Sequence, residues 1–482
     1  MATPILSISS TEIAGPAKLK EITRLMDILS SDLEKVTLLP HQRDAHLEQL
    51  KVYGRDPSNS DPIFTKQGIE TLTRHALNSP SLTTSRNALR CLANAMFLRP
   101  ETRKIFLDLR YEAKICNKLK NDSRDDEFLA SRVIFLTTYD ASVDLEIMID
   151  QWHLAENICT NLGRHTKQYT TKQKGVKEID PMEDMALIES LKLLFNVTHF
   201  CPERAGAFSP AIPHIFMLLT RRPVMSSKPL DPPIGTLINA LLNLELEAKD
   251  NAEKIFPRAA PNANVDRLID ILEQSTKAYT DDDLEHLASP LLTLLRKAHE
   301  VAQKDVQSHL KQRLLPSDAD RLQPLGRTET LPSRLIRLSS NATTPSIRES
   351  ISSLLFDLSE KDATKMVQNI GYGFASGFLF SHNIPIPENA AEAWSTSDSG
   401  SSRPRASNDS SKPVNPITGQ HLDAEQVVEL PEMTQEEKEN EAERLYVLFE
   451  RLRATGVVNV ENPVHTAMRK GRFTEVDDED SD

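Results

Sequence analysis

Glycine and aromatic residues are scarce in this chain, which has 15 glycines and 5% aromatic residues among its 482. Leu, Ala, Glu, Lys and Arg are abundant, so the composition favours helix over strand. The chain is also longer than a single compact core usually fills. We therefore expect either several domains or an extended array of helical repeats.

Cysteine is almost as rare, and its spacing excludes two kinds of site. Cys91, Cys116, Cys159 and Cys201 stand 25, 43 and 42 residues apart, without the close pairs of zinc or redox sites. Free thiols in a reducing compartment are the expected outcome. No apolar run approaches the ~20 residues of a membrane span. Met1-Ala2-Thr3-Pro4 carries neither a signal-peptide core nor the glycine that myristoylation requires. We expect a cytoplasmic protein with no direct membrane insertion.

The signatures of enzymes and nucleic-acid binders are missing as well. With 57 basic and 70 acidic side chains the formal charge is −13, which argues against a nucleic-acid partner. There is no phosphate-binding loop ending in GKS or GKT, no Gly-x-Ser-x-Gly and no His-Glu-x-x-His. The run Gly371–Gly377 places its third glycine one position too late for a dinucleotide fingerprint, so a tight turn between helices is expected there. We predict no catalytic residue, cofactor or metal.

What the chain does contain, from about residue 15 to 380, is a series of amphipathic helices separated by short breaks. A pattern of aliphatic-x-x-Leu-x-Asn recurs within them and ends at Asn94, Asn196 and Asn243. At 100° per residue the asparagine lies about 140° from the first apolar position, away from the buried stripe. Each amide is therefore predicted on another helix face. The pattern alone leaves open that asparagine is merely tolerated on exposed faces.

The spacing of this pattern indicates structural repeats. Asn196 and Asn243 are 47 residues apart, close to the period of armadillo and HEAT units, and Asn94 and Asn196 are 102 apart, enough for two units and an insertion near 166–180. Such repeats bury their apolar faces only by stacking on each other. The predicted fold is all-α: an armadillo/HEAT-type helical solenoid over residues 1–385, with a concave binding surface.

The composition changes after this region. Residues 386–425 are rich in Ser, Asn and Pro and are expected to form a flexible linker. In 426–482, Thr434 and Glu437 form a capping box at the start of a further helix. This C-terminal helix carries an apolar stripe that needs a surface to cover, formed by Leu445, Leu448, Phe449 and Leu452. An acidic tail follows it.

Two basic residues near the front of the solenoid share a spacing. Lys51 and Arg55 are four residues apart and lie on one helix face if the helix continues through Gly54. On charge alone, we expect both side chains to lie on a solvated surface.

Several segments together resemble the synembryn family, also called resistance to inhibitors of cholinesterase. They occur in order over most of the chain: 47–56, 87–95, 191–198, 237–246, 369–379, and the pair 412–419 and 433–438. Such a set is more specific than any single motif.

The resemblance implies a guanine-nucleotide exchange factor and folding chaperone for heterotrimeric G-protein α subunits, acting by differential binding without covalent catalysis. A concave groove would hold the C-terminal helix of the α subunit, and the C-terminal segment would contact its nucleotide-binding domain. A monomer is expected, with any recruitment to the plasma membrane going through the G protein.

The family's groove residues can be carried over by position. Lys51, Arg55 and Asn94 match such positions, although Lys51 replaces an arginine and loses its forked donor. Asn196 and Asn243 join the predicted binding residues through their periodicity, and Leu445, Phe449 and Leu452 through the apolar stripe. Ser395, with Asp398 three positions on, is a phosphorylation candidate, and an unmodified spacer is the alternative.

Two other functions remain open. An armadillo-type peptide-binding scaffold or transport adaptor also uses groove asparagines, but usually adds groove tryptophans, and this chain has only Trp152 and Trp394. The third possible function is that of a helical hydrolase with an unrecognised active site. A mixing test with purified α subunit and labelled GDP separates all three.

Overall fold

The computed structural model describes residues 14–170, 180–385, 414–415, 418–425 and 444. The chain divides into two units, Met1–Ala424 and Glu425–Asp482. Within the second unit only Glu425 and Arg444 are described, so the fold reported below is that of the first. None of the described helices is long and apolar enough to cross a membrane.

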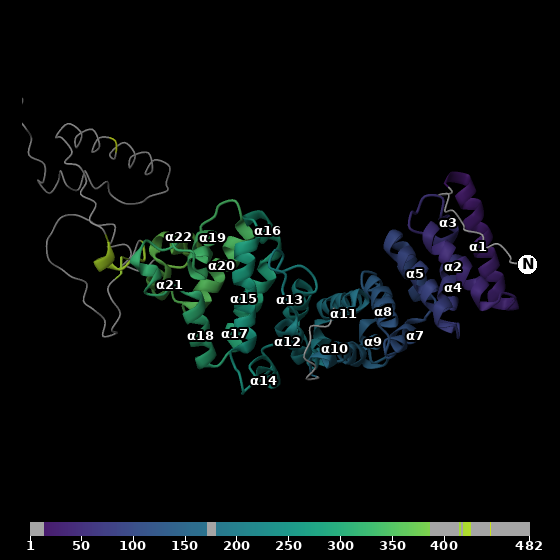
Figure 1. Ribbon diagram of the computed structural model, residues 1–482, viewed down its shortest axis with the longest axis horizontal. Helices are drawn as coiled ribbons and strands as arrows, with labels where there is room; N and C mark the ends of the chain where they lie inside the picture. The colour runs from purple at the N-terminus through teal and green to yellow at the C-terminus, as the bar shows by residue number, and fades with distance from the viewer. Residues whose placement is uncertain (1–13, 171–179, 386–413, 416–417, 426–443, 445–482) are drawn as a thin grey trace, which may run out of the picture. The chain divides into compact units, whose positions relative to one another are not determined.

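The first unit is a stack of helices, seven of which form a continuous series that we call the front row (Figure 1). Each front-row helix packs against the next one in the series. The front row consists of α2 (Pro40–Tyr53), α5 (Leu82–Leu98), α8 (Arg124–Thr137), α11 (Pro181–Phe200), α13 (Ile234–Leu242), α17 (Ser289–Val301) and α20 (Pro345–Leu358).

A second set of helices, the back row, covers the front row and packs mainly on it. The back row consists of α1 (Gly15–Lys35), α4 (Lys66–Asn78), α6 (Glu101–Asp108), α7 (Glu112–Lys118), α10 (Leu154–Thr170), α12 (Ala211–Arg221), α15 (Ala263–Ala278) and α19 (Leu331–Ser339). Shorter helices connect or close the rows: α3 (Asp61–Phe64), α9 (Leu145–Asp150), α14 (Ala252–Ile255), α16 (Asp281–Leu287), α18 (Lys304–Leu314), α21 (Ala363–Ile370) and α22 (Tyr372–Ser381). The 3₁₀ turns are η1 (Pro202–Phe208), η2 (Lys249–Asn251), η3 (Asp320–Leu322) and η4 (Leu422–Ala424).

Local sequence sets where the front-row helices begin. Ser81 caps α5, Ser123 caps α8 and Asp180 caps α11, each through a side-chain oxygen that accepts a backbone N–H of the first turn. The first three front-row helices start at Pro40, Leu82 and Arg124, 42 residues apart each time. The described residues form no β-strand, only one isolated bridge between Val414 and His421. The prediction of an all-α helical solenoid is confirmed.

Apolar stripes of both rows fill the core between them. Val133 and Ile134 of α8, for example, are fully buried. Each such side chain contributes roughly 1.5–3 kcal/mol relative to exposure. The expected turn at the glycine-rich run is also present, because Gly371 joins α21 to α22 with a φ of +81°.

Part of the expected linker is packed onto the helices. Residues 418–421 lie against η3, where the backbone N–H of His421 donates to the Arg321 carbonyl over 2.9 Å. The other described residues of this range are 414–415 and 422–425; the remainder lies outside the description.

A buried ionic network joins α8, α10 and α11. His165 of α10 and Glu127 of α8 are 0% and 1% exposed, and their Nε2 and Oε1 atoms lie 2.9 Å apart. Ser190 of α11 donates to the same Glu127 oxygen over 2.8 Å, and Arg124 donates to the other over 3.1 Å. Burial alone would lower the pKa of His165, but hydrogen bonds to Glu127 and Glu183 outweigh it and hold the pKa above the ordinary value. The pKa of Glu127 is lowered despite its burial.

These pKa directions predict how stability depends on pH. His165 has a raised pKa in the folded state, so its contribution is present at low pH and is lost as pH rises through that pKa. A double variant, Glu127→Gln with His165→Gln, lacks both charges and serves as the reference. Between pH 6 and pH 9 the free energy of unfolding of the wild type should fall relative to that of the double variant. His165→Gln alone, which leaves Glu127 without its histidine partner, should cost roughly 3–5 kcal/mol near pH 6.

Urea unfolding of the three proteins at several pH values measures both effects. A wild-type to double-variant difference that does not change with pH would show that folding leaves the pKa of His165 unchanged, and a difference that rises with pH would show that folding lowers it.

Candidate partner-binding face

One stripe of α8 is left uncovered by the surrounding helices. Its residues follow spacings of three and four along the helix and just past its end, whereas nearly all intervening positions are buried. The stripe consists of Asp125, Phe128, Arg132, Phe135 and Tyr139.

The neighbouring front-row helices have the same kind of stripe. In α5 the uncovered positions include Arg90, Asn94 and Phe97, and in α11 they include Lys192 and Phe195. In all three helices a cation precedes an aromatic residue nearer the carboxyl end. A basic band and an aromatic band therefore run across the three helices.

Contacts between the helices show that they run in the same direction. The Ser131 and Ser190 hydroxyls lie 3.2 Å apart near the middle of α8 and α11, and the rings of Tyr139 and Phe200 lie 6.2 Å apart at their ends. Beside α5, the Arg103 guanidinium lies 5.7 Å from the Tyr139 ring centre. The carboxyl ends of these helices therefore lie at the same edge of the stack.

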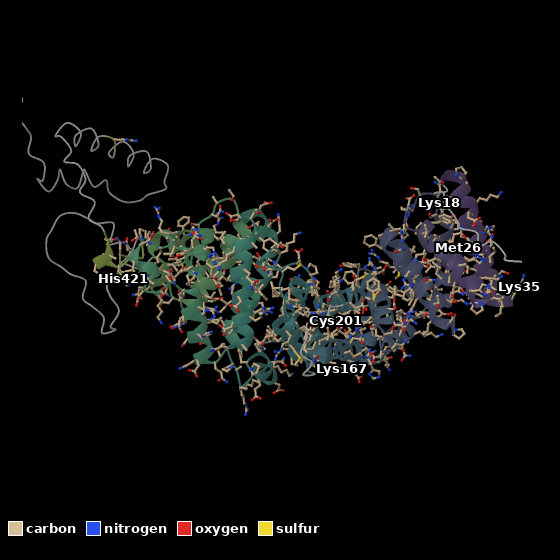
Figure 2. All side chains as sticks on the ribbon, viewed as in Figure 1. Lys18, Met26, Lys35, Lys167, Cys201 and His421 are labelled. Atoms are coloured by element: carbon tan, nitrogen blue, oxygen red, sulfur yellow. The ribbon has the colours of Figure 1, made fainter. Side chains whose placement is uncertain are left out.

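At this edge each of the first four front-row helices places one large apolar residue in solvent. We call this set the apolar row: Val52 (48% exposed), Phe97 (61%), Tyr139 (53%) and Phe200 (49%). Cys201, labelled in Figure 2, directly follows Phe200 and marks the end of α11. Regularly placed exposed apolar residues are typical of a surface that binds another protein.

Ring contacts hold part of the apolar row in place. Phe135 and Tyr139 meet edge to face with centres 5.3 Å apart, and His199 meets Phe200 at 5.0 Å. The rings of His199 and Phe195 are parallel, with centres 6.1 Å apart. Tyr139 and Phe200 are thus held by neighbouring rings, so little ordering of these two side chains remains to be done on binding.

The cations of the basic band are also held by carboxylates, those of Arg90 and Arg132 on the next helix and that of Lys192 on its own helix. Arg90 pairs with Asp125 at 3.0 Å, and Glu189, which is buried, accepts from both Arg132 and Lys192 at 3.1 Å. These pairs fix the helices side by side. These ion pairs also neutralise the positive charge of the basic band. The apolar row is therefore the stronger candidate for binding a partner on this face.

Comparison with known proteins decides the family. Residues 46–472 match the model of the family described as guanine nucleotide exchange factor synembryn. The chain belongs to the synembryn family.

Named synembryn relatives match at low identity over most of the chain. Chaperone Ric-8A of Gallus gallus is 24% identical, with 91% of this chain and 86% of that protein covered. The synembryn-like chaperone of Schizosaccharomyces pombe is 25% identical, with 73% and 66% covered. Among solved structures, an engineered protein aligns with 58% of this chain and 98% of its own at 14% identity and a TM-score of 0.40.

The two basic residues carried over from the synembryn family lie at the end of α2, but not on a common helix face. The helix ends at Tyr53, and Arg55 stands beyond it, exposed, so the condition for a shared helix face is not met. Gly54 ends the helix instead of continuing it. Lys51 is ion-paired with Glu48, one turn earlier on the same helix. Arg55 is left next to Val52 at the edge where the apolar row begins.

The three asparagines differ in what their amides bind. Asn196 is 6% exposed and donates to the Thr138 hydroxyl over 2.9 Å, and Asn243 donates to the Phe195 carbonyl over 3.2 Å. The prediction that each helix presents its amide from the side away from its buried stripe was therefore wrong for Asn196, which is buried, and Asn243 lies just past the end of α13 with its amide bonded to α11. A front-row helix has a neighbouring helix on each side. A side chain that lies 140° around the helix from the buried stripe therefore still reaches one of these neighbours. Asn94 is half-buried and has no side-chain hydrogen bond to any described residue.

The remaining predicted residues are not positioned. Leu445, Phe449, Leu452 and Ser395 all lie outside the described residues.

The described residues offer no activated nucleophile among the thiols. All four cysteines are buried and without disulfides, and burial raises the pKa of Cys91 and Cys159 to about 12. Nor does any group of three or more His, Cys, Asp or Glu in the described part of the chain have the arrangement to hold a metal ion.

Sequence reasoning missed the apolar row, although a signal was present. Phe97 follows Asn94 by three residues, and Phe200 follows Asn196 by four. A large apolar residue off the buried stripe, repeated at equivalent helix ends, would have identified the row.

The contrast between Asn94 and Asn196 gives a testable pair. Asn196→Ala should lower the free energy of unfolding by about 1–3 kcal/mol, because it removes a buried inter-helix hydrogen bond. Asn94→Ala should change it by less than about 0.5 kcal/mol, because its amide bonds to nothing within the described chain. Denaturant unfolding of both variants measures the difference. Equal losses would contradict the separation into one structural and one free amide.

Proposed function

We propose that this synembryn acts on α subunits of heterotrimeric G proteins, as exchange factor and as folding chaperone. The proposal rests mainly on one observation, the apolar row, part of which is held in place by ring contacts before any partner binds. The family description supplies the reaction class, and the row supplies a place where a partner can bind.

The geometry of the row suits an amphipathic helix lying across the front-row helices. Packed helices lie about 8–10 Å apart. Two turns of a bound helix rise about 10.5 Å, so apolar residues seven positions apart would meet successive members of the row. Arg55 and Asn94 stand beside it, and no described residue accepts a side-chain hydrogen bond from either of them. Their donors suit the polar face of such a helix. The C-terminal helix of the α subunit is the proposed occupant.

Exchange follows from linkage without covalent chemistry. The α subunit's C-terminal helix packs beside the loop that holds the guanine base. A face that holds this helix in a displaced position binds the empty subunit more tightly than the loaded one and must weaken GDP binding by the same factor. Each tenfold loss of GDP affinity requires about 1.4 kcal/mol of preference for the empty subunit. The same face would support an α subunit whose nucleotide pocket is still incomplete.

Release of labelled GDP from purified α subunit tests the proposal. The wild-type chain should accelerate release, and a double variant with Tyr139→Ala and Phe200→Ala should bind the α-subunit helix peptide more weakly by about 2 kcal/mol or more, roughly thirtyfold. Both side chains are about half exposed, so the melting temperature should hardly change. Phe380→Ala is the matched control, since Phe380 is 82% exposed but belongs to α22.

Three results would count against the proposal. Unchanged peptide affinity in the double variant would remove the apolar row from the site. An equal loss in Phe380→Ala would show a nonspecific effect of surface aromatics. Peptide capture without acceleration of GDP release would favour the peptide-binding scaffold instead.

A further inference from the structure

A groove lies next to the apolar row, beyond the carboxyl ends of α8 and α11. Its volume is 910 Å³, and two members of the row, Tyr139 and Phe200, are part of its lining. Cys201, labelled in Figure 2, is buried and directly follows Phe200 in the same lining. The loop after α8, the first turn of α9 and η1 supply the other lining residues. The groove is therefore continuous with the surface on which the partner helix is proposed to bind.

The charged side chains that line this groove are all acidic. Asp140, Asp144 and Glu203 form no ion pair with any described residue, and a fourth carboxylate, on Glu146, lies 3.0 Å from Arg204. Carboxylates beside aromatic rings suit a cation, because the oxygens attract it and the face of a ring accepts an ammonium or guanidinium group. We call the following residues the acidic groove: Tyr139, Asp140, Asp144, Glu146, Phe200 and Glu203.

Hydrogen bonds hold two of these carboxylates in position. Partial burial would raise the pKa of Asp140, but hydrogen bonds from the hydroxyl and the backbone N–H of Ser142 outweigh it and keep the pKa below its ordinary value. The Asp144 carboxylate caps α9 by accepting the Ile147 N–H over 2.9 Å. Both groups are therefore positioned before a partner binds.

The cations around the groove do not neutralise it. Arg204 is shared between Glu146 and Asp150, at 3.0 and 3.1 Å. On α6, Lys104 lies 3.8 Å from a carboxylate of its own helix, and Arg103 donates from its Nε to a backbone carbonyl over 2.9 Å. The groove keeps a surplus of negative charge, whereas the basic band lies on the other side of the apolar row.

We infer that the acidic groove binds a lysine or arginine side chain on one flank of the partner's helix, and that this contact fixes the direction in which the helix lies along the apolar row. This inference rests on the proposed function. An amphipathic helix can cover the row with its apolar stripe in two opposite directions, and reversing it exchanges the flank that faces the groove. Only one direction brings a basic flank to the carboxylates, because the other turns the same cations toward the basic band.

Neutralising the acidic groove tests the inference. Asparagine and glutamine remove the charge but keep an oxygen that can cap α9 or accept from Ser142. The probe is the α-subunit helix peptide, together with a copy in which every lysine and arginine is replaced by glutamine. At low ionic strength the affinity for the unaltered peptide should fall about tenfold in the groove variant. This groove variant combines Asp140→Asn, Asp144→Asn and Glu203→Gln.

A matched control variant separates a local effect from a change in net charge. It removes three exposed carboxylates of α1, α16 and α18 that form no ion pair with any described residue: Asp27→Asn, Asp282→Asn and Asp305→Asn. Its affinity for the unaltered peptide should stay within about twofold of the wild type. The peptide without cations should bind the wild type and both variants equally, which also shows that the groove variant is folded.

The direction of the helix is read from a photo-crosslinker at the amino end of the unaltered peptide. Crosslinks should concentrate at one end of the apolar row in the wild type, near either Val52 or Phe200, and should reach both ends in the groove variant. Crosslinks at both ends in the wild type would overturn the claim about direction.

The binding outcomes separate this inference from the proposed function. If the wild type captures the unaltered peptide and the groove variant does so equally well, the inference alone is wrong. Equal losses in the groove and control variants, or a loss that persists with the peptide lacking cations, also overturn it. Failure of the wild type to capture the unaltered peptide contradicts the proposed function, and the inference falls with it.

Discussion

The side-by-side packing of α5, α8 and α11 is the constraint on which the rest of the structure depends. Each of these helices is covered on its flanks by its neighbours and behind by the back row. Only one stripe per helix remains uncovered, and because the helices run in the same direction their stripes end at one edge. The exposed aromatic residues Phe97, Tyr139 and Phe200 become a row only because this packing aligns them.

Polar contacts between neighbours set the register of the stack. Glu189 of α11 takes two cations, one of them Arg132 of α8, and the Asn196 amide bonds to Thr138. Buried ion pairs are weak contributors to net stability, because desolvation offsets their attraction, but a broken one is costly. Sliding one helix along the next would break these pairs, so they hold the helices in register. The network around His165 acts in the same way between α8, α10 and α11, and the pKa directions there predict that the stability of this junction depends on pH.

The sequence predicted the class of fold well because helical periodicity is a local property. The turn expected at the glycine-rich run is confirmed at Gly371, between α21 and α22. The sites were harder, because exposure depends on neighbours that one helix does not reveal. Asn196 carries the same motif as Asn94, yet packing buries the first and leaves the second half-buried, with no hydrogen-bond partner for its amide among the described residues. Arg55 lies beyond α2 because Gly54 ends the helix, and the hydrogen bond from Arg321 to the Gly419 carbonyl joins residues almost a hundred positions apart, which no local pattern indicates.

The central claim is that the apolar row is where an α subunit binds, and side-chain footprinting tests it most directly. The chain is labelled with a short-lived carbene in the presence and absence of nucleotide-free α subunit, and labelling is read by mass spectrometry. Protection should concentrate on Val52, Phe97, Tyr139 and Phe200, while Met217 of α12 in the back row stays as reactive as in the free chain. Protection of α12 with an unprotected apolar row would contradict the account.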